Sequence, residues 1–348
     1  MIAKILHLAV AAPLLLSAMT APGAEAPAQE AAAPADGQKK TPRLIGGHPS
    51  VAWLIYIVAP QTLCTWNDPR TGRSLEIQNQ FISKEVRDLP EIGSRTMGGM
   101  NTESMLTQKP TAIITADFVR REVMSDSLAK NAGIKIVNLN FDQFECYPDG
   151  IRTIGELAGT PERGEHLAAF FTEMLKELKN RVDSIPEEKR LKVYYAGGIN
   201  GLETAAGNNV HDHIISYAGG KNAFPPHSAL NKVRFKVSLE QLLEYDPDVI
   251  IISAREVADG FKEKPGWKTL RAVKNNRVYL VPDAPVSWID RPVTVFQLMG
   301  AWWLASKLYP DKFPEGYRPM AERFFKECLQ VTLDELKWKL IDTDGEVK

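Results

Sequence analysis

One long amphipathic segment near the middle of the chain, residues 160–185, constrains the fold more than any other feature. Pro161 suits the first turn of a helix and Glu162 suits its positive end. At about 1.5 Å per residue, a helix of ~22 residues spans roughly 33 Å. We therefore predict a long helix that joins two compact lobes, with a packing helix inside a single domain as the alternative. Its apolar residues recur at spacings of three and four: Leu167, Phe171, Met174, Leu175, Leu178, Val182 and Ile185.

The first 26 residues have the pattern of a secretory signal peptide. Met1–Lys4 is basic, residues 5–18 are almost wholly apolar, and Ala24–Ala26 has the A-x-A form of a cleavage site. The apolar run is shorter than a membrane span, and no cysteine lies near the cleavage region. We therefore expect neither a transmembrane helix nor a lipid anchor. Residues 27–41 are rich in alanine and proline and are expected to form a disordered leader.

The composition of the chain excludes some functions. A hydrophobic fraction of 44% with a net charge of -1 describes a soluble globular protein and gives no support to nucleic-acid binding. The cysteines Cys64, Cys146 and Cys328 would enter an oxidising compartment, where at most one pair can form. Cys64 with Cys146 is one candidate pair, because both lie in the first half. None of the three has the spacing of a metal or redox motif.

Strand-like apolar runs alternate with helical patterns on both sides of the long helix, which predicts parallel sheets covered on both faces. The predicted fold is therefore α/β, with two Rossmann-like lobes joined by one long α-helix. We place the N-terminal lobe at 42–159, the linking helix at 160–185, the C-terminal lobe at 186–340 and a tail at 341–348. The strands are expected at 43–47, 111–115, 135–139, 191–195, 248–252 and 277–281, and the helices at 50–58, 118–131, 151–158, 210–218, 239–244 and 293–308.

The ligand site is predicted at the loops that follow the carboxyl ends of the strands, because these loops form the crevice in open parallel sheets. They show no serine, histidine and acid at motif spacing, no G-x-S-x-G, no Walker loop and no H-E-x-x-H. We therefore predict a protein that is not an enzyme, with no catalytic residues and no resident cofactor or metal. The loops carry His48, residues 95–99, Asp117, Arg120, Tyr147, residues 197–209, Arg255 and residues 287–291.

Several local patterns, in this order along residues 42–313, resemble the periplasmic binding proteins of ABC importers for siderophores, haem and cobalamin. Leu89–Gly93 is similar to that family's LPxVG element, and residues 100–110 are similar to its NxExxxxLKPDLV element. Residues 217–222 are similar to its LAGGxN element, and residues 237–250 to the second-lobe counterpart of the NxExxxxLKPDLV element. Residues 288–292 are similar to a late signature of the family.

The resemblance implies a monomeric periplasmic protein whose two lobes are bridged by one rigid helix. Its ligand would be an iron(III) chelate such as a siderophore or haem, or cobalamin, delivered to the membrane subunits of an ABC importer. In the family, a glutamate of each lobe docks onto those subunits, and Glu103 and Glu240 occupy the matching positions. Each could instead be an acid that only favours its own helix dipole.

Five residues are candidates for ligand contact. Arg95 and Arg291 could clamp an anion by bidentate hydrogen bonds, or each could be a structural salt-bridge partner. Trp288 and Tyr147 could stack on a planar chelate, or they could be packing residues. His48 could donate to an anion or ligate the metal of a chelate, or it could be a solvated loop histidine.

Two other ligand classes stay open. A molybdate or tungstate dianion would sit on arginine, hydroxyl and backbone donors, and the glycines at 98–99 and 197–201 would allow close backbone approach. A bare zinc or manganese ion would need three histidines and a carboxylate. The histidines available for it are His48, His211, His213 and His227.

Overall fold

The computed structural model describes residues 41–68, 70–93, 101–117, 126–206, 212–224, 234–290, 292–344 and 347. Thr41–Lys348 forms one compact unit. It contains two parallel sheets, one built from strands before the long helix and the other from strands after it. The predicted α/β class is confirmed.

The first sheet has the strand order β1-β2-β3, and all its pairs are parallel. Its strands are β1 (Leu44–Gly46), β2 (Ala112–Ala116) and β3 (Lys135–Leu139). The next element after β1 is α1 (Pro49–Val58), whose ten residues are all buried because the sequence there is almost entirely apolar. The other helices of this half are η1 (Pro60–Thr62), α2 (Gly72–Gln78), α3 (Lys84–Arg87), α4 (Thr102–Thr107), α5 (Asp126–Asn131), η3 (Phe144–Cys146) and α6 (Tyr147–Ala158).

The second sheet has the strand order β6-β4-β8-β9 and is also parallel. Its strands are β4 (Lys192–Ala196), β6 (Lys221–Asn222), β8 (Val249–Ile252) and β9 (Val278–Leu280), and a separate antiparallel pair joins β5 (Glu203–Thr204) to β7 (Phe235–Lys236). The helices of this half are η4 (Glu187–Lys189), α8 (His213–Tyr217), α9 (Leu239–Tyr245), α10 (Arg255–Ala258), η5 (Trp267–Thr269), α11 (Arg271–Lys274), α12 (Phe296–Leu308), η6 (Pro310–Lys312), α13 (Arg318–Phe324), the π-helix η7 (Phe325–Leu329) and α14 (Glu335–Ile341).

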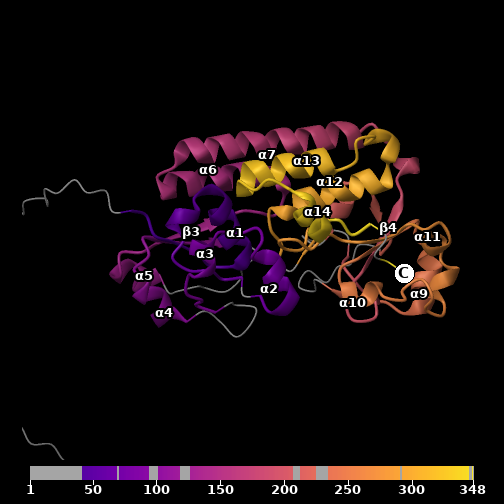
Figure 1. Ribbon diagram of the computed structural model, residues 1–348, viewed down its shortest axis with the longest axis horizontal. Helices are drawn as coiled ribbons and strands as arrows, with labels where there is room; N and C mark the ends of the chain where they lie inside the picture. Colours follow the sequence, from indigo (N-terminus) through magenta and orange to yellow (C-terminus); the bar gives the residue numbers. More distant parts are fainter. Residues whose placement is uncertain are drawn as a thin grey trace, which may run out of the picture. The chain divides into compact units, whose positions relative to one another are not determined.

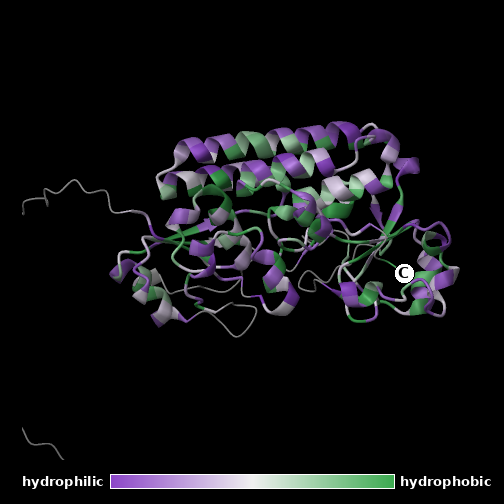
Figure 2. Cartoon of the chain, viewed as in Figure 1, coloured by the Kyte–Doolittle hydropathy of each residue, from purple (hydrophilic) through white to green (hydrophobic). Residues whose placement is uncertain are grey.

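The long helix α7 (Pro161–Val182) has 22 residues and lies within the predicted segment 160–185. Its predicted apolar face is buried along the whole helix, from Leu167 to Val182, and Figure 2 shows hydrophilic and hydrophobic residues side by side along it. Figure 1 shows α6 running next to α7. The two helices can approach closely because glycines face each other at the contact. A Cβ on Gly155 would lie only 2.9 Å from the Cα of Gly164.

The two halves also share a hydrophobic core beyond α7. The Trp53 ring of α1 packs edge-on against Phe296 of α12, with ring centroids 5.5 Å apart. The rings of Phe81 and Phe325 are likewise 5.5 Å apart. In addition to α7, helices near the C-terminus therefore pack against the first half of the chain. The sequence pattern did not predict these contacts. The lobe limits 42–159 and 186–340 stay a prediction.

The three cysteines are free thiols in the structure. Cys64 is buried and donates to the Leu44 carbonyl oxygen at 3.2 Å, and burial raises the pKa of its thiol to about 11. Cys328 is buried as well, and burial raises the pKa of its thiol far above the usual value. In the part of the chain that the structure describes, no helix is both long enough and apolar enough to cross a membrane.

Candidate ligand site at the strand ends

His48 lies directly after the end of β1 and caps α1. Its Nδ1 accepts a hydrogen bond from the backbone N–H of Ser50 at 3.2 Å and lies 2.9 Å from the Ser50 hydroxyl. Because Nδ1 acts as an acceptor for the helix, the neutral ring carries its proton on Nε2. His48 thus lies at the carboxyl end of the first strand, the position predicted for a ligand contact.

Residues 63–68 bring further polar groups to the same end of β1, because Leu63 pairs in parallel with Leu44. The Asn67 side-chain amide donates to the Gly46 carbonyl oxygen at 2.6 Å, while its Oδ1 is buried without a hydrogen-bond partner in the described part of the chain. Asp68 is buried and accepts from the Trp53 indole at 2.9 Å. It also forms an ion pair with Arg70 at 3.0 Å.

The second sheet carries an arginine that no sequence motif indicated. Arg234, just before β7, forms an ion pair with Asp290 at 2.6 Å, and its guanidinium lies 5.9 Å from the centroid of the Tyr195 ring. The Tyr195 hydroxyl donates to the same carboxylate at 3.1 Å. Asp290 is only 1% exposed, so this ion pair is shielded from water. The three side chains hold one another at the carboxyl end of β4.

One nitrogen of Arg234, NH1, is buried and has no hydrogen-bond partner among the described residues. It lies beside Gly197, the residue after β4, because a Cβ placed on Gly197 would be 3.3 Å from it. Leaving a buried donor unsatisfied costs about 1–3 kcal/mol, and more when the donor is charged. Such a donor at a strand end is suited to an acceptor that comes from a ligand.

A second cation lies at the next strand end of the same sheet. Arg255 opens α10 after β8 and pairs with Asp283, which follows β9, at 3.1 Å. The sequence had placed Arg255 among the strand-end loops, and the structure agrees. This ion pair is partly exposed, with side-chain exposures of 23% and 33%.

A short series of contacts connects the polar residues at the end of β1, which include Asp68, with those at the end of β4, which include Arg234 and Asp290. Trp53 donates to Asp68 in the first group, and its ring packs on Phe296. The next residue, Gln297, donates from its side-chain amide to the Ile289 carbonyl oxygen at 2.7 Å. Ile289 directly precedes Asp290, so only a few packed side chains separate the anchor of Arg234 from Asp68.

The aromatic residues predicted for ligand stacking lie in the core. Trp288 is 0% exposed, donates from its indole to the Ala284 carbonyl oxygen at 3.0 Å and contacts the Tyr317 ring. Tyr147 is 4% exposed and packs among aromatic rings, with that of Phe141 5.0 Å away. Neither ring offers a face to a ligand in this structure, so the alternative reading, that both are packing residues, is favoured.

The remaining predicted ligand residues fall outside the description. Arg95 and Arg291 are not among the described residues, and neither are His211 and His227. His213 opens α8 beside the Phe144 ring, with ring centroids 5.9 Å apart. Within the described ranges, no three histidine, cysteine, aspartate or glutamate side chains gather as they would around a metal ion.

The two predicted docking glutamates are exposed residues in the first turns of α4 and α9. Hydrogen bonds from its own backbone N–H and from the Ser238 hydroxyl lower the pKa of Glu240. Both helices are capped, by Asn101 for α4 and by a Ser238–Gln241 capping box for α9. The same geometry suits both readings, a dipole-favoured acid and a surface carboxylate for a partner.

The family of the chain follows from its similarity to known proteins. Residues 67–285 match the model of a family described as periplasmic binding protein. The chain belongs to the periplasmic binding protein family. A solved ABC transporter solute-binding protein from Sulfurospirillum deleyianum is 32% identical with a TM-score of 0.77, covering 86% of this chain and 94% of that one.

Two curated relatives differ in the ligand that their names give. The molybdate-binding protein MolA of Haemophilus influenzae is 26% identical over 262 residues, which is 68% of this chain and 73% of that protein. The Fe(3+)-citrate-binding protein YfmC of Bacillus subtilis is 28% identical over 195 residues, or 55% and 59% of the two chains. Both relatives are named as binding proteins, and this chain, as a member of the family, is a solute-binding protein and not an enzyme.

Proposed function

We propose that this periplasmic binding protein captures a compact oxyanion, such as molybdate or tungstate, at the strand ends and delivers it to an ABC importer. The observation that carries the proposal is Arg234, whose NH1 is buried without an acceptor among the described residues while Asp290 and Tyr195 hold the rest of the guanidinium. A guanidinium is a strong and geometrically specific donor to an oxyanion. Gly197 lets the backbone pass close to NH1, because a Cβ there would lie only 3.3 Å from it.

Shape separates the compact oxyanion from a planar chelate. Haem and cobalamin present large flat faces, which are usually met by aromatic rings, but Trp288 and Tyr147 are both enclosed by protein. A tetrahedral dianion needs only donors, and relatedness to a protein named for molybdate agrees with this choice. Ferric citrate is the second candidate, because it is anionic and compact and because another relative is named for it.

Further donors are proposed to complete the site. His48, whose ring caps α1 at the end of β1, would contribute a hydrogen bond to the anion. Arg95 and Arg291 remain proposed partners of the anion, on the sequence argument alone. Glu103 and Glu240 are proposed to dock onto the two membrane subunits of the importer. Both are exposed, and their helices α4 and α9 belong to different halves of the chain.

The protein is proposed to act in the periplasm after export through the signal peptide of residues 1–26. It is proposed to work as a monomer.

Isothermal titration calorimetry with a panel of ligands tests the proposal. We expect saturable binding of molybdate and tungstate at one site, and weaker or no binding of sulfate, ferric citrate, haem and cobalamin. Zinc and manganese belong in the same panel, since a bare-cation receptor would bind them alone. Tight binding of haem or cobalamin without any molybdate response would contradict the oxyanion proposal.

A further inference from the structure

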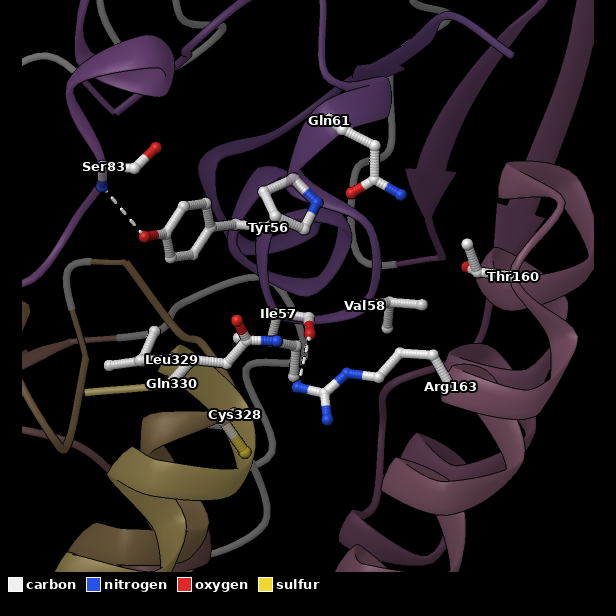
Figure 3. Close-up of a pocket in the computed structure, with 11 residues that line it drawn as sticks. Tyr56, Ile57, Val58, Gln61, Ser83, Thr160, Arg163, Cys328, Leu329 and Gln330 are labelled. Atoms are coloured by element: carbon white, nitrogen blue, oxygen red, sulfur yellow. Dashed lines mark hydrogen bonds between the residues drawn. The ribbon is translucent and has the colours of Figure 1, made fainter. Parts of the chain in front are cut away.

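A cavity of about 330 Å³ lies where the end of α1, the start of α7 and the π-helix η7 meet. Figure 3 shows the side chains of Gln61, Thr160 and Arg163 around it. It is far along α1 from the strand-end site, because His48 caps the beginning of that helix and residues 56–58 at its end line the cavity. The remaining lining residues are Pro60, Ser83, Cys328, Leu329 and Gln330.

Among the described residues that line this cavity, Arg163 alone carries a charge. Its NH2 donates to the Ile57 carbonyl oxygen at 3.3 Å and to the Glu327 carbonyl oxygen, and both acceptors are neutral. Within the described residues its Nε and NH1 make no hydrogen bond. The carboxylate of the neighbouring Glu327 is paired with His166 at 2.7 Å. The pKa of Glu327 is lowered mainly by its hydrogen bond from His166 and also by the charge of Arg163, while Nε and NH1 of Arg163 keep their donors for another partner.

Two further groups beside Arg163 favour an anion. The hydroxyl oxygen of Thr160 is buried without a hydrogen-bond partner among the described residues. Thr160 also stands at the N-cap of the 22-residue helix α7, where the helix dipole is positive and the first N–H groups lack acceptors within the helix. The guanidinium and the hydroxyl therefore both line this cavity with unused donors, and the start of α7 adds the positive end of its dipole beside Thr160.

The rest of the wall is apolar, because Ile57, Val58 and Leu329 border the same space. A bare inorganic ion would leave these surfaces in contact with water, whereas a molecule with a carboxylate and a short apolar body would cover them. We propose that this cavity is a second ligand site, which takes a small amphipathic monocarboxylate with its carboxylate on Arg163 and Thr160. The site is independent of the proposed oxyanion function.

The test uses 4-fluorobenzoate as the probe, with binding followed by ¹⁹F NMR line broadening. A ligand of this size on one charged contact should bind with a dissociation constant on the order of 1 mM. The uncharged isostere 4-fluorobenzamide should bind at least tenfold more weakly, because it cannot form the ion pair. Arg163→Met should weaken 4-fluorobenzoate binding roughly 10- to 150-fold.

Two other variants keep the test decisive. Thr160→Val leaves the carbonyl bonds of Arg163 intact and should weaken binding several-fold, even if Arg163→Met proves unstable. Arg234→Met, at the strand-end site, should leave 4-fluorobenzoate binding unchanged. Crystals soaked with 4-bromobenzoate should show the bromine among Ile57, Val58 and Leu329. The proposal is overturned by absence of binding at 20 mM, by equal binding of the amide, or by a bromine at the strand-end site instead.

Discussion

Replacing Gly300 with alanine tests whether α12 positions the segment that anchors Arg234. A Cβ on Gly300 would lie 2.0 Å from the Trp288 carbonyl oxygen, whereas real Cβ contacts essentially never fall under 3.0 Å. The helix and this segment must therefore separate by about 1 Å, the difference between those two distances. The shift would strain the 2.7 Å hydrogen bond from Gln297 to Ile289 and displace Asp290, which holds Arg234.

Two opposing effects set the magnitude of the loss. Alanine in place of glycine within a helix stabilises by about 1 kcal/mol, while overpacking against a core costs typically 1–3 kcal/mol and occasionally more. Because the obstacle here is backbone and not a mobile side chain, we expect a net loss of about 1–2 kcal/mol. For a compact unit that spans Thr41–Lys348, an unfolding entropy of about 2.1 cal/mol/K per residue converts this loss into a Tm lower by roughly 1.5–3 °C.

Gly150→Ala is the matched control, since it makes the same substitution inside α6. Its Cβ would approach the outer edge of the Phe141 ring at 2.6 Å, and a ring can turn aside. We expect the control to change stability by less than about 1 kcal/mol and to leave molybdate affinity unaltered. Differential scanning calorimetry and ligand titration compare the two variants. If Gly300→Ala behaves like the control in both, α12 does not position the segment.

Three further predictions concern pH, docking and motion. Partial burial raises the pKa of Glu145, but hydrogen bonds from Tyr217 and Lys179 outweigh it and hold the pKa below its usual 4.5. The stability that Glu145 contributes is therefore complete above about pH 4.5 and is lost as the pH falls through the lowered pKa, so the Tm difference between wild type and Glu145→Gln should be largest at pH 7 and shrink as the pH falls below 4.5. A difference that grows on acidification would contradict this. Charge reversal of both Glu103 and Glu240 should leave the ligand dissociation constant within a few-fold and abolish stimulation of the importer's ATPase; a collapse of binding would place these residues in the ligand site. Because α7 and the shared core resist bending, ligand binding should change the radius of gyration in small-angle scattering by less than several per cent, and a larger drop would argue for a flexible hinge.

Regular elements were predictable because their periodicity is local. The strand of residues 135–139 was predicted with the limits that β3 has, and α7 begins and ends within the predicted segment. The helix expected at 293–308 begins at Phe296, three residues later, because the Thr294 hydroxyl accepts a hydrogen bond from the Phe296 N–H at 3.2 Å before the first turn. Apolar residues that recur every second position indicate a strand, and those that recur at spacings of three and four indicate a helix. Both patterns can be recognised without knowledge of tertiary contacts.

The candidate site was less predictable because its contacts join residues far apart in the chain. Arg234 meets Asp290 and Tyr195 only through the order of strands, and nothing in its neighbouring sequence marks it. The aromatic pair illustrates the same limit. Trp288 and Tyr147 have the chemistry of either a stacking platform or a core filler, and their burial decides the question only in three dimensions.

The most direct test of the central claim is molybdate affinity in Arg234→Met and Arg234→Lys, measured by calorimetry together with Tm. Hydrogen bonds from a guanidinium to a charged partner contribute about 1.5–3 kcal/mol, so the methionine variant should bind roughly 10- to 150-fold more weakly. The lysine variant should recover only part of this loss, because an ammonium cannot reproduce the planar fork. Unchanged affinity in Arg234→Met, with only a lowered Tm, would assign Arg234 to the fold and contradict the oxyanion site.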